Sequence, residues 1–295
     1  MFKLKYIQLK IVLSGYRGLI GSALERMLKD ENYEVIHLSR TDLYDHEGTA
    51  LMKLLEGATA AIHLAGAPIL RRWTTRNRKE MYDSRIITTL NLTNAIKALP
   101  ATARPKIFIS ASAIGIYEAG LTHTESSTRY AGHFAAQLTR EWEASSEALP
   151  KEVRRLMYRV GLVLDRKATL IRMLTLPFRL FAGGPVGNGK QPFPFIHLED
   201  VTGAILWGIQ NPDAQGIYNL TAPEQISNKD FSSAFGKSLN RPSWFPVPVF
   251  LLKLLYGQAA RLIFESPAVI PDRLLKEGYR FRFPDIGSAL KAVTG

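Results

Sequence analysis

Residues 11–24, with the sequence IVLSGYRGLIGSAL, carry the pattern that decides the fold. A strand-length apolar run comes first, the spacing G-x-x-G-x-x-G follows at Gly15, Gly18 and Gly21, and a helical pattern of apolar residues then begins. In such a turn the first glycine permits the bend, the second lets the backbone approach a pyrophosphate, and the third allows close helix–strand packing. The free N–H groups of the helix N-terminus attract phosphate. The segment therefore predicts a dinucleotide site at the first crossover.

Strand-length apolar runs alternate with helical patterns through the first half of the chain. Strands are expected at residues 9–14, 33–38, 60–65, 106–111 and 153–160, and helices at residues 22–29, 78–98 and 132–148. This alternation predicts right-handed βαβ crossovers and a parallel sheet covered by helices on both faces. The predicted fold class is therefore α/β, a Rossmann-type doubly wound parallel sheet.

The second half of the chain differs in its pattern of loops, strands and helices. Gly- and Pro-rich loops follow residue 164, two further strands are expected at residues 193–197 and 216–220, and the remaining tail is predicted to be mainly helical. The predicted division of the chain is a dinucleotide-binding domain at residues 1–164, with a sheet completed by about residues 193–220, and a smaller C-terminal substrate lobe at residues 165–192 and 221–295. Such a lobe closes over the carboxyl edge of the sheet, where α/β proteins bind ligands.

The end of the second predicted strand indicates which nucleotide is bound. An NAD site usually holds the ribose 2′-hydroxyl there with Asp or Glu, whereas this chain has Ser39 followed by Arg40. An arginine pairs with the 2′-phosphate of NADP(H), which a carboxylate repels, and Arg17 in the glycine turn adds a second cation. Asp42 is the rival feature, but it lies beyond the strand end. The predicted cofactor is NADP(H).

Composition excludes several classes of protein. None of the 295 residues is a cysteine, which rules out disulfides, thiolate catalysis and Cys-ligated metal sites. The first residues lack the continuous apolar segment of a secretory signal, and no run of 18 apolar residues predicts a membrane span. We therefore expect a cytoplasmic protein, a monomer or a homodimer. The net charge of +12 can attract nucleic acid, but the basic residues are scattered and no nucleic-acid-binding motif accompanies them.

Several stretches together resemble the extended short-chain dehydrogenase/reductase superfamily. They are the glycine turn and residues 62–69 (IHLAGAPI), 110–117 (SASAIGIY) and 195–201 (FIHLEDV). Further stretches resemble an NAD(P)-dependent epimerase subfamily with a C-terminal domain of unknown function. They are residues 72–74, 84–89, 141–143, 159–164 and 270–281. The resemblance covers about residues 9–292 and implies a Rossmann domain, a small substrate lobe and NADP(H).

The resemblance and the local chemistry together suggest roles for individual residues. Cofactor contacts are expected from Gly15, Arg17, Gly18, Leu19, Ile20, Gly21, Ser39, Arg40, Leu64, Ala65, Gly66, Ser110 and Arg159. The candidate catalytic residues are Ser112 and Tyr117. Substrate contacts are expected from Arg72, Trp73, Arg85, Phe195 and His197. His197 also has a structural interpretation, because Asp200 is predicted to cap the helix that follows it.

The chain departs from the superfamily in one respect. Its working members carry Tyr and Lys four residues apart on the helix after the active-site strand, where the lysine lowers the pKa of the phenol. The only such spacing here, Tyr6 and Lys10, precedes the glycine turn. Two main hypotheses stay open, namely an NADP(H)-dependent oxidoreductase or epimerase acting on a small polar or nucleotide-linked substrate, and a non-catalytic NADP(H)-binding sensor or partner-binding protein. A basic surface for nucleic acid is a third.

Overall fold

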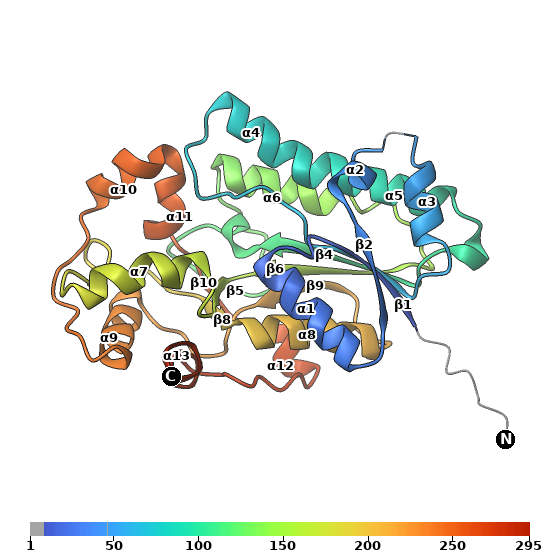
Figure 1. Ribbon diagram of the computed structural model, residues 1–295. Helices are drawn as coiled ribbons and strands as arrows, with labels where there is room; N and C mark the ends of the chain where they lie inside the picture. The colour runs from blue at the N-terminus through green and yellow to red at the C-terminus, as the bar shows by residue number, and fades with distance from the viewer. Residues whose placement is uncertain (1–8, 46) are drawn as a thin grey trace, which may run out of the picture.

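Six parallel strands form the centre of the computed structural model, which describes residues 9–45 and 47–295 (Figure 1). They run in the order β2 (Glu34–Leu38), β1 (Lys10–Ser14), β3 (Ala60–His63), β4 (Ile107–Ala113), β6 (Arg154–Val160) and β9 (Gly216–Leu220). The chain leaves β1 for β2 on one side and returns to β3 on the other, and α/β proteins bind ligands at such a switch point. The predicted fold class is confirmed. The expectations about a secretory signal and about Tyr6 lie outside the described residues.

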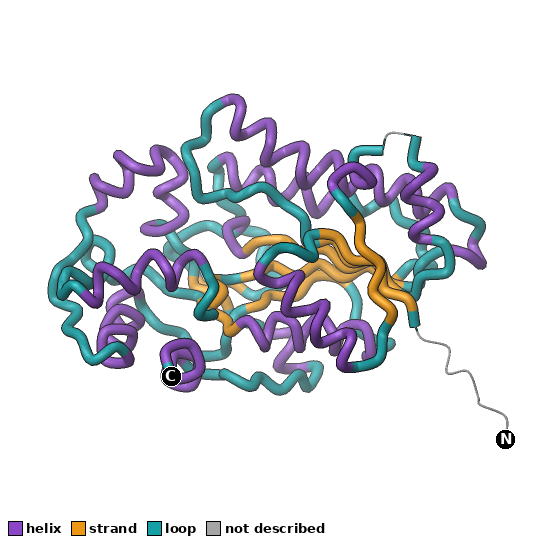
Figure 2. The backbone as a smooth tube through the Cα atoms, in the orientation of Figure 1, coloured by secondary structure: helices purple, strands orange, loops and turns teal. Residues whose placement is uncertain are grey.

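Helices cover both faces of the sheet (Figures 1 and 2). One face carries α1 (Leu19–Asp30) and α8 (Leu198–Gln210), and the other carries α2 (Arg40–Leu43), α3 (Thr49–Leu55), α5 (Thr88–Ala98) and α6 (Phe134–Ala144). The alternation along β1 matches these two layers, since Ile11 and Leu13 belong to one buried cluster and Val12 to the other. The sheet is therefore buried on both faces, as expected for parallel strands.

Two predicted helices differ in their bounds. α1 begins at Leu19, three residues before the predicted start, because Gly18 is its N-cap. The single helix predicted at residues 78–98 begins at Thr75 and consists of α4 (Thr75–Tyr82), the π-helical turn η1 (Asp83–Ile87) and α5. A π-turn inserts an extra residue into a helix and is frequent at functional sites.

The C-terminal half adds a small, mainly helical lobe. Its elements are β7 (Leu162–Leu164), α7 (Thr169–Arg179), β8 (Phe195–His197), α9 (Asn228–Ser238), α10 (Val249–Tyr256), α11 (Arg261–Phe264), β10 (Ala268–Val269), α12 (Asp272–Lys276) and α13 (Ile286–Thr294). β9 joins the main sheet beside β6, whereas β8 pairs with β7 in a separate two-stranded sheet. β10 pairs with β5 (Thr122–His123). Short 3₁₀ turns lie at η2 (Ala101–Ala103), η3 (Ile114–Ile116) and η4 (Gly257–Ala260).

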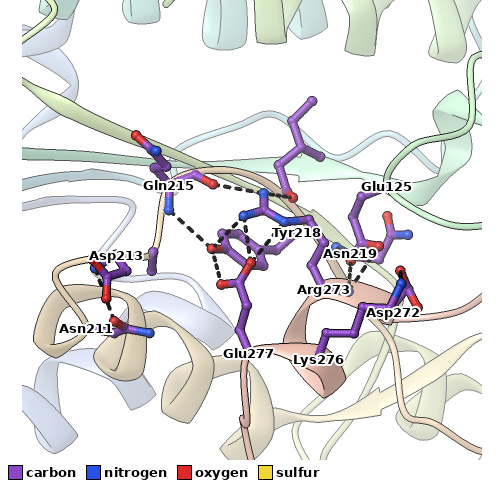
Figure 3. Close-up of polar contacts among 12 residues, drawn as sticks. Glu125, Asn211, Asp213, Gln215, Tyr218, Asn219, Asp272, Arg273, Lys276 and Glu277 are labelled. Atoms are coloured by element: carbon purple, nitrogen blue, oxygen red, sulfur yellow. Dashed lines mark hydrogen bonds and ion pairs between the residues drawn. The ribbon is translucent and has the colours of Figure 1, made fainter.

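Buried and half-buried polar side chains attach the C-terminal tail to the sheet. Arg273 of α12 donates to the carbonyl oxygens of Gln215 (2.8 Å) and Ile217 (2.9 Å), pairs with Glu277 (2.7 Å) and packs on the Tyr218 ring at 4.1 Å (Figure 3). These four contacts join Arg273 to residues 215–218 at the start of β9 and to Glu277 just after α12.

Asp200 has a different role from the predicted one. The N-cap of α8 is His197, whose Nδ1 accepts the Glu199 N–H at 3.3 Å. The Asp200 carboxylate instead accepts the backbone N–H groups of Arg282 (2.7 Å) and Phe283 (2.9 Å). The prediction that Asp200 caps α8 was therefore wrong, because a distant segment that is not apparent from local spacing supplies its partners.

Candidate functional site

The glycine turn has a geometry that only glycine allows. Gly15 has a φ of +72°, and a Cβ there would lie 2.6 Å from the carbonyl carbon of Leu64. A Cβ on Gly21 would lie 2.2 Å from the Gly15 carbonyl oxygen. Gly18 donates its N–H to that oxygen at 2.9 Å and caps α1 without a side chain. Within the described residues, the first N–H groups of α1 therefore have no side-chain capping bond.

A pocket of about 300 Å³ opens in front of this turn. It is lined by Gly15, Tyr16, Arg17, Gly18, Leu38, Arg40, Leu43, Tyr44, Ala65, Gly66, Ala67, Glu80, Ser84 and Thr88. The Arg40 guanidinium packs on the Tyr44 ring at 5.6 Å, and that of Arg17 packs on the Tyr16 ring at 5.4 Å. Tyr16 in turn stacks on the His37 ring at 3.9 Å. The pocket thus combines backbone N–H groups, two arginines and aromatic walls.

Asp42 is the carboxylate near the end of β2 that could have indicated NAD, but it is already hydrogen-bonded to the backbone. Its carboxylate accepts the Ser39 N–H at 2.7 Å, and Ser39 Oγ accepts the Asp42 N–H at 3.2 Å. This reciprocal capping box begins α2. The carboxylate therefore serves the backbone, while Arg40 lines the pocket.

The ends of β1 and β3 are joined by a buried histidine. The His63 ring lies 2.7 Å from Ser14 Oγ through Nδ1 and 3.1 Å from Thr88 Oγ1 through Nε2. Ser14 Oγ also accepts the Leu64 N–H at 3.2 Å. Burial, with the nearby charge of Arg85, lowers the pKa of His63 to about 3. His63 is therefore neutral and holds the third-strand loop in place.

Arg85, at the centre of the π-turn, lies directly beneath that loop. A Cβ on Gly66 would stand 3.1 Å from its guanidinium carbon, and the guanidinium lies 5.1 Å from the centre of the Trp142 ring. Within the described residues, the guanidinium makes one hydrogen bond, in which Nη1 donates to the Met81 carbonyl oxygen at 3.4 Å. Burial, with the charge of Arg71, lowers the pKa of Arg85 to about 10. A cation without a carboxylate partner therefore lies next to the pocket wall.

A buried polar chain occupies the end of β4. Ser112 Oγ donates to Glu143 Oε1 on α6 at 2.5 Å. Arg159 of β6 donates to both oxygens of the same carboxylate, with Nε–Oε1 and Nη2–Oε2 distances of 2.8 and 2.7 Å. Burial alone lowers the pKa of Arg159, but the hydrogen bonds and charge of Glu143 outweigh it and raise that pKa. Ser112 and Arg159 are thus brought together by Glu143.

Tyr117 extends this chain toward the C-terminal lobe. Its hydroxyl accepts from Arg159 Nη1 at 2.7 Å, donates to Asn219 Oδ1 at 2.8 Å and lies 3.1 Å from the Thr124 carbonyl oxygen. Only 1% of Tyr117 is exposed, and this burial raises the pKa of its hydroxyl. Asn219 continues the chain by donating to the Ile270 carbonyl oxygen at 3.1 Å. The Tyr117 hydroxyl is therefore enclosed by protein groups.

Ser112, Tyr117 and Arg159 do not line the pocket, and the predicted site residues that remain do not line it either. Arg72 Nε donates to the Leu255 carbonyl oxygen of α10 at 3.2 Å, and Trp73 Nε1 donates to the Ile69 carbonyl oxygen at 3.1 Å. Phe195 is fully buried in the lobe core. Ser110 is also fully buried, with its hydroxyl on the Ala111 carbonyl oxygen at 3.0 Å, and His197 caps α8. In the part of the chain that the structure describes, no group of His, Asp and Glu side chains could hold a metal ion.

Sequence reasoning missed the partners that organise this site. Glu143 and His63 belong only to stretches that resemble the superfamily, and Asn219 was not among the predicted site residues. Their partners lie far along the chain, so local spacing does not reveal them. The capping box of Ser39 and Asp42 could have been found from the Ser-x-x-Asp spacing before an apolar residue.

Comparison with known proteins gives a consistent result. A family model described as "NAD dependent epimerase/dehydratase family" matches residues 11–221, and a "Domain of unknown function (DUF1731)" matches residues 247–293. The chain is 33% identical to the chloroplastic "Epimerase family protein SDR39U1 homolog" of Arabidopsis thaliana, over 98% of this chain and 88% of that protein.

Two solved structures are similar over almost the whole chain. The human epimerase family protein SDR39U1 (isoform 2), crystallised with NADPH, is 31% identical, has a TM-score of 0.88, and is matched over 97% of this chain and 99% of its own. A nucleoside-diphosphate sugar epimerase of Corynebacterium glutamicum is 26% identical, with a TM-score of 0.77, over 98% of this chain and 58% of its own.

Proposed function

The chain belongs to the NAD dependent epimerase/dehydratase family, and from this premise we propose that it binds NADP(H) and acts as an oxidoreductase or epimerase on a small polar or nucleotide-linked substrate. NADP(H), when bound, supplies hydride exchange at its nicotinamide ring. The substrate class is supported by the nucleoside-diphosphate sugar epimerase among the similar structures.

The observation that carries the proposal is the fit of the pocket to a phosphorylated dinucleotide. Added side-chain atoms at Gly15 and Gly21 would meet backbone at 2.6 and 2.2 Å, so the tight turn that presents the helix N-terminus to the pocket requires glycine at both positions. The α1 N–H groups and helix dipole would hold the pyrophosphate. Arg17 and Arg40, which line the same pocket, would hold the 2′-phosphate by charge-assisted hydrogen bonds.

Ser112 is the residue that we assign to the substrate oxygen. Its hydroxyl proton is directed to Glu143 Oε1, so the lone pairs of its oxygen are left to accept a hydrogen bond from a substrate hydroxyl. Arg159 fixes the orientation of the Glu143 carboxylate through two hydrogen bonds. Tyr117 positions Arg159 from the other side. Arg85 supplies a cation for an anionic substrate group beside the third-strand loop.

Calorimetry followed by a turnover screen tests this function. NADPH is expected to bind more tightly than NADH, and at least one nucleotide-linked sugar or small carbonyl compound should be turned over with a change in NADPH absorbance. Ser112→Ala should keep NADPH binding and lose turnover. Equal affinity for the two nucleotides, or turnover that Ser112→Ala leaves intact, would contradict the proposal.

A non-catalytic NADP(H)-binding protein is the second candidate, and a specific observation favours it. α6 has the sequence FAAQLTREWEA, so it carries neither the tyrosine nor the lysine of the superfamily. Tyr117, which follows β4, has an enclosed hydroxyl. Tight NADPH binding, a ligand-dependent change in hydrogen exchange of residues 247–293, and no turnover across the screen would support this candidate over the first.

We propose the cytoplasm as the compartment and a monomer or homodimer as the assembly. Among the described residues, no helix is long and apolar enough to cross a bilayer. Cell fractionation and light scattering of the purified protein test the two statements.

A further inference from the structure

One end of the molecule exposes an unusual amount of apolar surface. Leu176, Leu180 and Phe181 project from α7 and its C-terminal end, and Trp244, Phe250 and Leu254 from the segment that includes α10. Trp244 is 79% exposed, Leu180 67% and Phe250 66%. We call these six side chains the α7/α10 face. Single exposed apolar residues need no explanation, but a group of large ones marks an interaction site.

The two halves of this face lie side by side. The Phe245 N–H donates to the Gly183 carbonyl oxygen at 3.3 Å, and the Val247 N–H donates to that of Pro185 at 2.8 Å. The Arg241 guanidinium packs on the Phe181 ring at 4.9 Å. α7 and α10 are found at the same end of the lobe in Figure 1. The segments that carry the exposed side chains are therefore neighbours in the fold.

α10 has no partner that would explain its composition. Its sequence is VFLLKLLY, and none of its residues is buried. A helix that is apolar around most of its circumference is normally buried in a core or an interface. Within the described residues, α10 is buried neither in a core nor in an interface. Its apolar side chains are therefore available to a partner outside this chain.

The charges around this face identify that partner. Between Asp165 and Glu199 the sequence carries five Lys and Arg residues and no acidic residue, and between Asp230 and Glu265 it carries four and none. These two stretches contain α7 and α10, and within the described residues only Arg261 of these nine cations pairs with an acidic side chain, that of Glu265. A second copy of the chain would bring a like charge to the same face and be repelled.

We propose that the α7/α10 face docks on an anionic membrane surface. Trp and Leu side chains of such a face enter the boundary between headgroups and acyl chains, while Arg and Lys remain at the level of the lipid phosphates. Each cation near the surface adds electrostatic attraction that salt weakens. Nucleic acid would satisfy the cations but leave the Leu side chains of α10 in water.

Sedimentation of the full-length protein with vesicles tests the proposal. Vesicles of phosphatidylcholine alone are compared with equal mixtures of phosphatidylcholine and phosphatidylglycerol. The protein should bind the mixed vesicles, bind neutral vesicles far less, and be released by added salt. The double variant Trp244→Ser/Phe250→Ser should weaken binding at least about tenfold, because two large side chains no longer enter the bilayer.

Two further double variants test the contribution of charge and the effect of changing exposed apolar residues elsewhere on the protein. Arg179→Glu/Lys253→Glu should remove the preference for anionic vesicles. Leu90→Ser/Leu121→Ser, which changes two exposed apolar residues outside the face, should bind as the unaltered protein does. The six positions substituted in the three double variants are all exposed, so the melting temperature of each variant is expected to stay the same. It serves as the folding control independently of any cofactor.

Three outcomes would overturn the proposal. The first is equal binding to neutral and anionic vesicles, or none to either. The second is a dimer that Trp244→Ser/Phe250→Ser dissociates, with no vesicle binding, which would assign the face to a second copy. The third is salt-sensitive binding of duplex or single-stranded nucleic acid in place of vesicles.

Discussion

Arg159 of β6 and Glu143 of α6 form a two-pronged ion pair inside the molecule, with only 1% of the Arg159 side chain exposed to solvent. The pair lies beside Ser112 at the end of β4, because Ser112 Oγ donates to the Glu143 carboxylate. Removing one member of a buried pair leaves an uncompensated charge. The pair therefore sets both the stability of this region and the orientation of Ser112.

Glu143→Ala should lower the free energy of unfolding by about 3–5 kcal/mol, because the buried Arg159 cation then has no counter-charge. Urea unfolding measures this difference. Glu141→Ala on the same helix is the matched control, since the Glu141 carboxylate bonds only the exposed Gln137 side chain, and it should change stability by less than about 0.5 kcal/mol. Similar effects of the two variants would show that the pair contributes little.

Arg40→Ser should weaken NADPH binding about 10- to 100-fold, because it removes charge-assisted hydrogen bonds to the 2′-phosphate. NADH, which lacks that phosphate, should bind with unchanged affinity. Titration calorimetry with both nucleotides measures the ratio. Arg26→Ser removes the same charge from the exposed side of α1 and should leave the ratio as it is. A parallel loss of NADH affinity would place Arg40 elsewhere on the nucleotide.

Gly21→Ala should abolish nucleotide binding and destabilise the protein, because its Cβ would stand 2.2 Å from the Gly15 carbonyl oxygen. Neither atom can move without opening the turn. Gly132→Ala is the control, since a Cβ there meets nothing within 4 Å. Thermal unfolding with and without NADPH measures both effects. An alanine tolerated at Gly21 with normal NADPH affinity would contradict this account of the turn.

Features that neighbouring residues determine could be predicted from the sequence, whereas contacts between residues far apart in the chain could not. The glycine turn, the strands and the arginine at the end of β2 are local features, so each could be identified from neighbouring residues. Helix bounds were less certain, since the π-turn at residues 83–87 has no pattern that distinguishes it from an ordinary helix. Periodicity indicates a helix but not an inserted residue.

The polar chain at the end of β4 shows what the sequence could not provide. Glu143 and Arg159 are 16 residues apart, and Tyr117 and Asn219 are 102 apart. Nothing in the spacing of these residues says that their side chains meet, because the sheet order brings them together. Only the assembled fold therefore shows that the Tyr117 hydroxyl is enclosed and that Ser112 donates to a carboxylate.

Acid should destabilise the protein through His63. Its pKa is about 3 in the folded state, because it is fully buried, against 6.5 in an unfolded chain, so the unfolded state binds the proton more tightly. The stability that neutral His63 contributes is therefore present above pH 6.5 and is lost as the pH falls toward 3. The slope is about 1.4 kcal/mol per pH unit.

Urea unfolding at pH 7 and pH 5 measures this slope, and His63→Asn isolates it from the titration of carboxylates. Between pH 7 and pH 5 the unaltered protein should lose about 2 kcal/mol more than His63→Asn. Equal losses in the two proteins would mean that His63 takes up a proton in the folded state.

Tyr117→Phe separates positioning from proton transfer. It leaves Arg159 Nη1 and Asn219 Oδ1 without the hydroxyl between them, which should lower the free energy of unfolding by about 1–3 kcal/mol. Burial raises the pKa of that hydroxyl, and protein groups enclose it, so we expect it to transfer no proton to a substrate. Any turnover found in the screen should therefore fall by less than the ~100-fold that loss of a general acid brings, with an unchanged pH profile. Tyr82→Phe, at an exposed position, is the control for stability. A loss of 100-fold or more with intact folding and NADPH binding would instead make Tyr117 the proton donor, because a positioning residue has no reason to affect the chemical step so strongly.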